Sequence, residues 1–256
     1  MAKLIAHFHA ACAKVILRPM KYPKYYRLKQ FLLKILRLTE VRPRSGFFTI
    51  LRERLYKYGW TENEGYHSQG GQDRFIDTIV LNRLEGGTYV EIGANDGLTI
   101  SNTLFFEKVR KWRGCCVEPN PVQFGKLTKN RDAKCLNICV GAQNGVCSFP
   151  VISDSDASLL GRIGDKSAEG IVEIDQVDLP TLFKMLEYEH IDYLSIDTEG
   201  AEYGIVRSLE RTEIRPCVIA IEQNVTAFDL DGLMVRLGYK LQAKVYTDRI
   251  YRLQPV

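Results

Sequence analysis

The chain has 256 residues, 45% of them hydrophobic and 26% charged. This suits one folded domain with an appendage and excludes any need for a disulfide or a metal to stabilise the core. The seven cysteines are an odd number without C-x-x-C spacing, so we interpret them as reduced, buried thiols in a cytosolic protein rather than as metal or redox ligands. The longest apolar stretch, residues 4–17, is too short for a membrane span and makes a poor signal peptide.

The charge is divided unevenly along the chain. Residues 1–60 contain fourteen Lys and Arg against two acids, which gives +12, whereas the remainder has 21 basic and 29 acidic residues, which gives −8. We expect a basic, largely helical extension over residues 1–65 and a folded domain over residues 66–256. The Phe, Leu and Ile among the basic residues of 1–45 are typical of a segment on an anionic membrane surface, so we expect a cytoplasmic protein with peripheral membrane attachment. A solvated or partner-binding extension and a mitochondrial transit sequence stay open.

Short runs rich in Val and Ile alternate with amphipathic stretches from about residue 85 onward. The runs predict buried parallel strands at residues 88–94, 114–119, 136–142, 191–197 and 217–223, and the stretches predict helices at 98–112, 120–130, 180–189 and 200–212. Near the end of the chain, residues 238–245 and 248–254 are expected to pair as an antiparallel hairpin. This order predicts a doubly wound α/β sheet of seven strands, six parallel and one reversed in the hairpin.

One region does not fit the α/β repeat. In residues 145–179, two apolar runs flank a long polar loop. We predict an inserted hairpin there, with residues 153–170 as a mobile lid, because long polar loops in compact domains are often lids.

The first predicted strand ends in the stretch YVEIGANDG, residues 89–97. A glycine turn between a strand and a helix can hold an anionic group on backbone amides. The dinucleotide fingerprint G-x-G-x-x-G fails here, because its second and third glycines fall on Asn95 and Leu98. The pattern E-x-G-x-x-x-G instead resembles the first motif of class I S-adenosylmethionine-dependent methyltransferases, in which Glu91 would face the ammonium group or order the water around it. Pairing of Glu91 with a buried Arg or Lys stays open.

The second predicted strand ends in VEPN, which places Glu118 at 21 residues beyond Gly97. A carboxylate at this position can accept hydrogen bonds from both ribose hydroxyls of a nucleoside cofactor. The two motifs together predict a cofactor site across Gly93, Gly97 and Glu118.

Four motifs in this order and spacing resemble the FkbM-type methyltransferase family: SQGGQD (68–73), YVEIGANDG, CCVEPNP (115–121) and DYLSIDTEGAEYGIVRSL (192–209). The resemblance covers residues 66–254 and leaves the basic extension outside. It implies a Rossmann-like class I methyltransferase fold with S-adenosylmethionine as cofactor. The residues implied or expected to contact the cofactor are Gln69, Asp73, Glu91, Gly93, Asn95, Asp96, Gly97, Glu118, Pro119, Ala142, Gln143 and Asp197. For Asp73, a plain helix-capping role stays open.

Acidic residues follow the later strands and are the candidates for chemistry. Asp197 ends the fourth predicted strand, Glu199 follows it, and Glu222 lies at the end of the fifth. One of them is expected to act as the base that removes a hydroxyl proton. Alternatively, Asp197, Glu199 and Glu222 are ligands of a divalent cation that acidifies a sugar diol. The spacing leaves both roles open.

The acceptor is expected from the resemblance to be a sugar hydroxyl, in a lipid-linked glycan, a polysaccharide or a glycosylated metabolite. Nucleic acid is disfavoured as a partner, because N-P-P-Y and D-P-P-Y motifs are absent and the folded body carries −8. A non-catalytic, membrane-associated factor is the other alternative. The presence of Gly93, Glu118 and Asp197 favours catalysis over that alternative.

Overall fold

The computed structural model describes residues 65–151, 170–223 and 228–255. Apart from Gly65, the predicted N-terminal extension lies outside the described residues, and apart from Gly170 so does the predicted lid. None of the helices in the described ranges is long and apolar enough to cross a bilayer.

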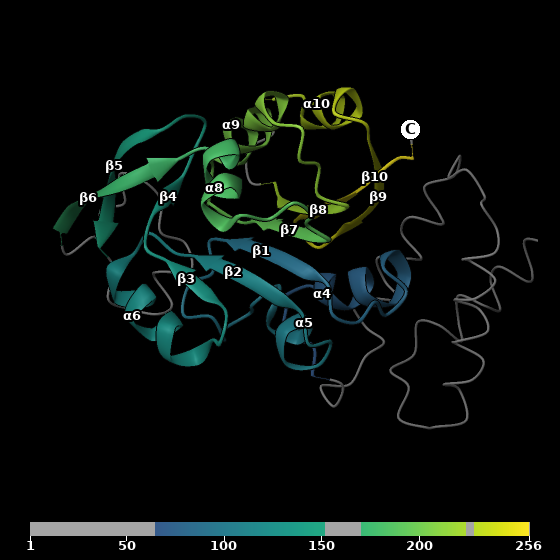
Figure 1. The fold of residues 1–256 in the computed structure, drawn as a ribbon, viewed down its shortest axis with the longest axis horizontal. Coiled ribbons are helices and arrows are strands. Elements are labelled where there is room, and N and C mark those ends of the chain that lie inside the picture. The colour runs from purple at the N-terminus through teal and green to yellow at the C-terminus, as the bar shows by residue number, and fades with distance from the viewer. Residues whose placement is uncertain (1–64, 152–169, 224–227, 256) are drawn as a thin grey trace, which may run out of the picture.

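A seven-stranded sheet in the order β3-β2-β1-β7-β8-β10-β9 forms the centre of the molecule (Figure 1). From β3 to β8 neighbouring strands pair parallel, whereas β10 pairs antiparallel with both β8 and β9. The prediction of a doubly wound sheet with one reversed strand in a terminal hairpin is therefore confirmed. The strands are β1 Thr88–Ile92, β2 Arg113–Val117, β3 Lys134–Leu136, β7 Tyr193–Ile196, β8 Val218–Glu222, β9 Tyr239–Val245 and β10 Asp248–Leu253.

The order of the strands reverses between β1 and β7. The first three strands extend toward one edge of the sheet, and β7 and β8 extend toward the other. Such a reversal opens a crevice at the carboxyl ends of the two central strands, which is where open α/β sheets bind ligands. A site is therefore expected just beyond Ile92 and Ile196, the last residues of β1 and β7.

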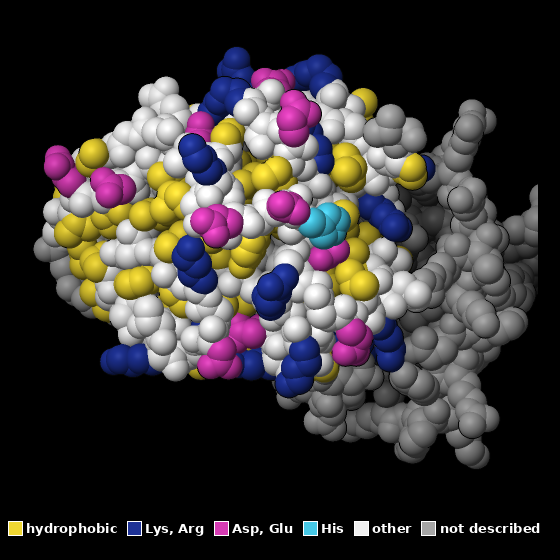
Figure 2. Space-filling view, in the orientation of Figure 1, with side chains coloured by type: hydrophobic (Ala, Val, Ile, Leu, Met, Phe, Trp, Pro, Cys, Tyr) yellow, Lys and Arg dark blue, Asp and Glu magenta, His cyan; other side chains and the backbone are white. Residues whose placement is uncertain are grey.

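Helices cover both faces of this sheet (Figure 1). On the outer surface in the same view, basic and acidic side chains are interspersed with hydrophobic ones (Figure 2). Side chains alternate along each strand, so Val90 packs against the helices on one face and Tyr89 against those on the other. One face carries α8 Leu179–Leu186, α9 Glu202–Arg207 with the 3₁₀ turn η3 Ser208–Arg211, and α10 Leu230–Arg236. The opposite face carries α4 Gln72–Phe75 with the π-helical turn η2 Ile76–Val80, α5 Leu104–Lys108 and α6 Pro121–Asn130.

The helix expected over residues 98–112 is much shorter than predicted. It comprises only α5, Leu104–Lys108. The residues before it turn inward instead. The carboxylate of Glu91 accepts hydrogen bonds from the Ser101 hydroxyl, the backbone amide of Asn102 and the Thr103 hydroxyl. These donors are not available to a regular helix, so the buried carboxylate sets where α5 begins.

The strand expected over residues 136–142 is divided between two sheets, so that prediction was wrong. β3 ends at Leu136 in the main sheet, and β4 Cys139–Val140 belongs to a separate sheet of order β4-β6-β5. The Asn137 side chain donates to the backbone carbonyls of Glu118 and Pro119, which turns the chain away from the main sheet. An antiparallel pair, β5 Gly145–Val151 with β6 Gly170–Val177, stands where the inserted hairpin is predicted.

Candidate functional site

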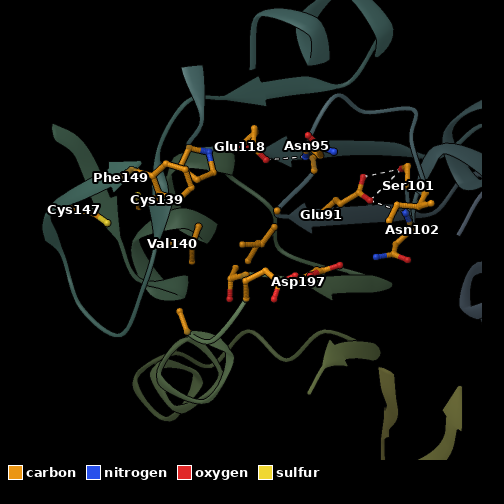
Figure 3. A pocket seen from close by; sticks show the side chains of 18 of the residues that line it. Glu91, Asn95, Ser101, Asn102, Glu118, Cys139, Val140, Cys147, Phe149 and Asp197 are labelled. Carbon is orange, nitrogen blue, oxygen red and sulfur yellow. Dashed lines mark hydrogen bonds between the residues drawn. The ribbon is translucent and has the colours of Figure 1, made fainter. Parts of the chain in front are cut away.

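A pocket opens at the carboxyl ends of β1, β2 and β7, where the strand order reverses (Figure 3). It encloses about 1020 Å³ of space, its open mouth included. Its lining comprises Glu91, Ile92, Gly93, Ala94, Asn95, Thr99, Ile100, Ser101, Asn102, Glu118, Pro119, Cys139, Val140, Cys147, Phe149, Gln176, Asp197, Thr198, Glu199 and Ala201. The second sheet thus supplies one wall of the pocket, which the sequence did not predict.

Gly93 lets two loops of the pocket touch. It has φ 85°, and a β-carbon built on it would lie 1.7 Å from the carbonyl oxygen of Asp197. No other residue fits this position, because any side chain would push the turn after β1 away from the end of β7. The first glycine of the motif therefore sets the floor of the crevice.

Several residues around the pocket have left-handed backbone conformations. Asn95, Ile100 and Glu199 have φ of 48°, 49° and 58°. Ile100 is β-branched, and such a residue is a genuine outlier in this region. Backbone strain of this kind persists where the surroundings enforce it, and it gathers at functional sites.

Glu118 lies at the end of β2 with its carboxylate at the pocket (Figure 3). Its Oε2 accepts from the Asn95 amide and its Oε1 from the Asn120 amide, both at 2.8 Å. Each oxygen has a second lone pair, so the carboxylate can still accept two hydroxyl groups. Burial raises the pKa of Glu118 to about 7 in spite of the two amides.

Glu91 takes the role that the sequence left open as the alternative, because it pairs with a buried arginine. Arg131 Nη1 lies 3.1 Å from Glu91 Oε2, and both side chains are almost fully buried. With the three donors before α5, the carboxylate has its acceptor positions occupied by the protein. Glu91 still lines the pocket, but its charge is already balanced there.

Asn102 is a site residue that the sequence did not reveal. Its Oδ1 is buried and has no hydrogen-bond partner, and the residue lines the pocket (Figure 3). A buried acceptor without a partner is costly unless a ligand satisfies it. The residue fell within the predicted helix 98–112, and no local motif distinguished it.

These features fit S-adenosylmethionine. Glu118 offers two acceptor positions for ribose hydroxyls, and Asn102 Oδ1 offers one for an ammonium group. Val140, Cys147 and Phe149 supply an apolar wall on one side of the pocket (Figure 3), which suits a purine ring.

Other predicted contacts lie outside the pocket lining. Asp96 accepts from the amides of Leu98 and Thr99, and Gly97 packs against the side chains of Leu127 and Arg131. Both residues therefore shape the turn after β1 from behind. Asn95 and Pro119 do line the pocket.

Asp73, Gln69, Ala142 and Gln143 also lie outside the pocket lining. The Asp73 carboxylate accepts from the backbone amides of His67 and Ser68, so it orders the segment before α4. It does not cap that helix, whose N-cap is Gly71. Gln69 is exposed, as are Ala142 and Gln143. As cofactor contacts, all four remain predictions from the resemblance.

The predicted acids meet at the same edge of the sheet. Oxygens of Asp197, Glu199 and Glu222 lie within 4.8 Å of one another. Burial raises the pKa of Asp197 well above its usual range, and the neighbouring Glu222 carboxyl raises it further. Asp197 therefore holds its proton more tightly than an exposed aspartate does.

Asp248 is a fourth acid beside this group, and the sequence did not single it out. It is paired in register with Glu222 across β10 and β8. Burial and then the charge of Glu222 raise the pKa of Asp248 to about 7. The side chain of Gln72, from the motif SQGGQD, donates to Asp248 at 2.8 Å. Gln72 of that motif therefore contacts this group of acids directly.

Comparison with known proteins gives one family and several structural similarities. The family model described as the methyltransferase FkbM domain matches residues 91–241. No match was found among curated proteins. A methyltransferase FkbM from Methylobacillus flagellatus KT is similar at 14% identity and a TM-score of 0.48, over 90% of this chain and 59% of that chain. This chain therefore spans less than two thirds of that protein.

Two further solved structures have lower TM-scores. The precorrin-6y C5,15-methyltransferase from Geobacter metallireducens GS-15 is similar at 11% identity and a TM-score of 0.44, over 76% of this chain and 96% of that one. A methyltransferase from Pyrococcus furiosus is similar at 18% identity and a TM-score of 0.35, over 80% of this chain and 94% of that one.

Proposed function

The chain belongs to the methyltransferase FkbM domain family, and from that premise we propose that it transfers a methyl group from S-adenosylmethionine to a hydroxyl of a sugar. The sugar would belong to a glycolipid, a polysaccharide or a glycosylated metabolite. The observation that carries the proposal is the position of the Asp197–Glu222 carboxyl pair directly beside the pocket that fits the cofactor.

The cofactor would be held by polar acceptors at one part of the pocket and by apolar side chains at another. Glu118 would accept the ribose hydroxyls, and Asn102 Oδ1 would accept from the ammonium group. The apolar side chains of Val140 and Phe149 would pack against the adenine. When bound, S-adenosylmethionine supplies an electrophilic methyl group on a positively charged sulfur.

The carboxyl pair would handle the proton of the acceptor. A sugar hydroxyl is a weak nucleophile, and a carboxylate within hydrogen-bond reach can take its proton as the new O–CH₃ bond forms and the S–CH₃ bond breaks. Burial and Glu222 raise the pKa of Asp197, so its ionised carboxylate is a stronger base than an exposed one. Holding the hydroxyl in line would contribute still more, up to about 7–11 kcal/mol of the barrier.

A sugar acceptor is supported by the polar character of this edge of the sheet. Glu199 and Glu222 place carboxyl groups next to Asp197 at this edge. Such a set can hydrogen-bond several hydroxyls of one ring, and a polyanion such as nucleic acid would be repelled. Membrane attachment through residues 1–45 would make a lipid-linked sugar accessible. Binding of the full chain to anionic vesicles, weakened by salt and absent with neutral vesicles, tests that attachment.

The test of the function begins with glycans and lipids extracted from cells with and without the gene. Mass spectrometry should find a species that differs by one CH₂ group. Purified protein should then methylate that species from labelled S-adenosylmethionine. Transfer of the label to RNA or protein instead would contradict the proposal, and absence of any transfer would favour the non-catalytic alternative.

Two variants assign the residues. We expect Asp197→Asn to lower turnover by about 10²–10⁴-fold while S-adenosylmethionine still binds, and Glu118→Ala to weaken cofactor binding. Glu210→Gln, on the exposed end of η3, serves as the matched control. Loss of activity on adding a chelator, restored by Mg²⁺ or Mn²⁺, would assign Asp197, Glu199 and Glu222 to a divalent cation instead of to base catalysis.

A further inference from the structure

A group of three side chains at the other end of the strands takes no part in the proposed reaction. His190 and Asp192 immediately precede β7, and Cys217 immediately precedes β8. One ligand atom from each lies within 4.8 Å of the other two. β7 and β8 are four and five residues long, which puts this group about 13–17 Å from the acids at the carboxyl ends.

The distances within this group are close to those of a tetrahedral zinc site. His190 Nε2 lies 2.9 Å from Asp192 Oδ1 and 3.7 Å from Cys217 Sγ. Zinc bonds of about 2.3 Å to sulfur and about 2.0–2.1 Å to nitrogen and oxygen, at tetrahedral angles, put S and N about 3.6 Å apart and N and O about 3.3 Å apart. An ion is accommodated if the side chains move by a few tenths of an ångström.

Two of the three ligands are held by the backbone. Asp192 Oδ2 accepts from the amide of Thr88 at 2.8 Å and from its hydroxyl at 3.2 Å, which leaves Oδ1 to face His190. The amide of Cys217 donates to Ile191 O at 2.8 Å, so the cysteine is fixed beside the strand that carries the aspartate. This is the outer-shell support that orients metal ligands in proteins. The His190 side chain is 61% exposed, which gives an ion access from solvent.

A nucleophilic triad is a poorer interpretation of the same residues. In such a triad the histidine uses one ring nitrogen for the nucleophile and the other for the acid. Here Asp192 and Cys217 both approach Nε2 of His190. The three ligand atoms therefore face a common point, as the ligands of a metal ion do.

We propose that His190, Asp192 and Cys217 bind one Zn²⁺ ion, with water as the fourth ligand. The thiol loses its proton to solvent on binding, because thiolate is the ligand form. A sulfur–nitrogen–oxygen set selects zinc over Mg²⁺ and Ca²⁺, which prefer oxygen ligands. The ion joins the beginnings of β7 and β8, and through Thr88 that of β1, so its role is to stabilise the sheet and not to take part in methyl transfer.

The experiment uses the full chain after treatment with a chelator. Calorimetric titration with Zn²⁺ should show one ion per chain and a raised melting temperature. His190→Ala should weaken binding at least tenfold, and it should fold normally because the side chain is exposed. Co²⁺ should give a thiolate charge-transfer band that Cys217→Ser abolishes. Cys135→Ser, a change at another partly buried cysteine, should keep both zinc affinity and the band.

Further variants separate this site from the reaction. Asp197→Asn should keep the zinc affinity, and His190→Ala should keep the affinity for S-adenosylmethionine. Absence of stoichiometric zinc binding, or binding that survives in both His190→Ala and Cys217→Ser, overturns the proposal. A loss of zinc in Asp197→Asn also overturns it, because the ion would then lie at the carboxyl ends of the strands.

Discussion

In the described part of the chain, one group of carboxylates surrounds a buried arginine, and another group lies together without one. Glu91 and Glu107 surround Arg131, whose guanidinium also donates to Tyr89 and Thr103. Asp197, Glu222 and Asp248 lie close to one another, and the pKa of two of them is raised by burial and by Glu222.

The pKa values show the difference in energy. Burial alone would raise the pKa of Glu107, but hydrogen bonds from Tyr89 and attraction to Arg131 lower it to about 2. For Asp248 burial and Glu222 act together, and its pKa rises to about 7. Ionisation of the first group therefore stabilises the folded state, whereas ionisation of the second group destabilises it. A cost of this kind marks a site that is kept for binding or catalysis.

The largest expected effect comes from breaking the balanced group. Arg131→Met would leave Glu91 and Glu107 buried without a counter-charge, and removal of one partner from a buried ion pair costs about 3–5 kcal/mol. Urea unfolding followed by circular dichroism measures this loss. Arg211→Met is the matched control, because its pair with Asp178 has a half-exposed arginine and should contribute about 0–1 kcal/mol. Equal losses in the two variants would contradict the assignment.

Glu118 shares one property with each group. Like Glu91 it is buried and hydrogen-bonded, and like Asp248 it has no cation among the groups that shift its pKa. Its pKa is raised from 4.5 to about 7. The folded state therefore holds a proton that the unfolded state has released, so stability falls as the pH rises from 4.5 to 7 and is level above that range. The difference corresponds to about 3 kcal/mol.

Glu118→Gln should remove this part of the pH dependence. We expect the stability difference between the variant and the wild type to shift by up to about 3 kcal/mol between pH 4 and pH 8 in favour of the variant. Denaturation at several pH values measures this shift. The pKa values of Asp73 and Asp248 are also raised, but their pH dependence is common to both proteins and cancels in the difference. The same variant should bind S-adenosylmethionine less tightly at pH 8. Parallel pH profiles for the two proteins would show that Glu118 keeps its ordinary pKa.

The main sheet was predictable because its signals are local. Short Val- and Ile-rich runs gave β1, β2, β7 and β8, and two residues between two apolar runs gave the hairpin β9–β10. Glu118 was also predictable, because a strand end followed by a helix cap fixes where its carboxylate lies. Asn120 does cap α6.

The remainder depends on contacts between distant residues. Arg131 is 40 residues from Glu91, so the sequence could name a buried basic partner for Glu91 only as an alternative. The wall formed by Cys147 and Phe149 depends on the second sheet, whose strand β4 looked like the end of a strand in the main sheet. Asp248 faces Glu222 only through the antiparallel register of β10 with β8.

The smallest expected effect, and the sharpest test of the comparison, is in the unbalanced group. Asn at position 197 is a neutral isostere whose amide can donate to Glu222, as a protonated aspartate would. Because burial and Glu222 raise the pKa of Asp197, the wild type loses stability as the pH rises, and Asp197→Asn lacks that loss. We expect the variant to be more stable by about 1 kcal/mol at pH 8, with the difference vanishing in acid, although it should be inactive. A variant that is less stable at pH 8 would show that Asp197 supports the fold, as Arg131 does.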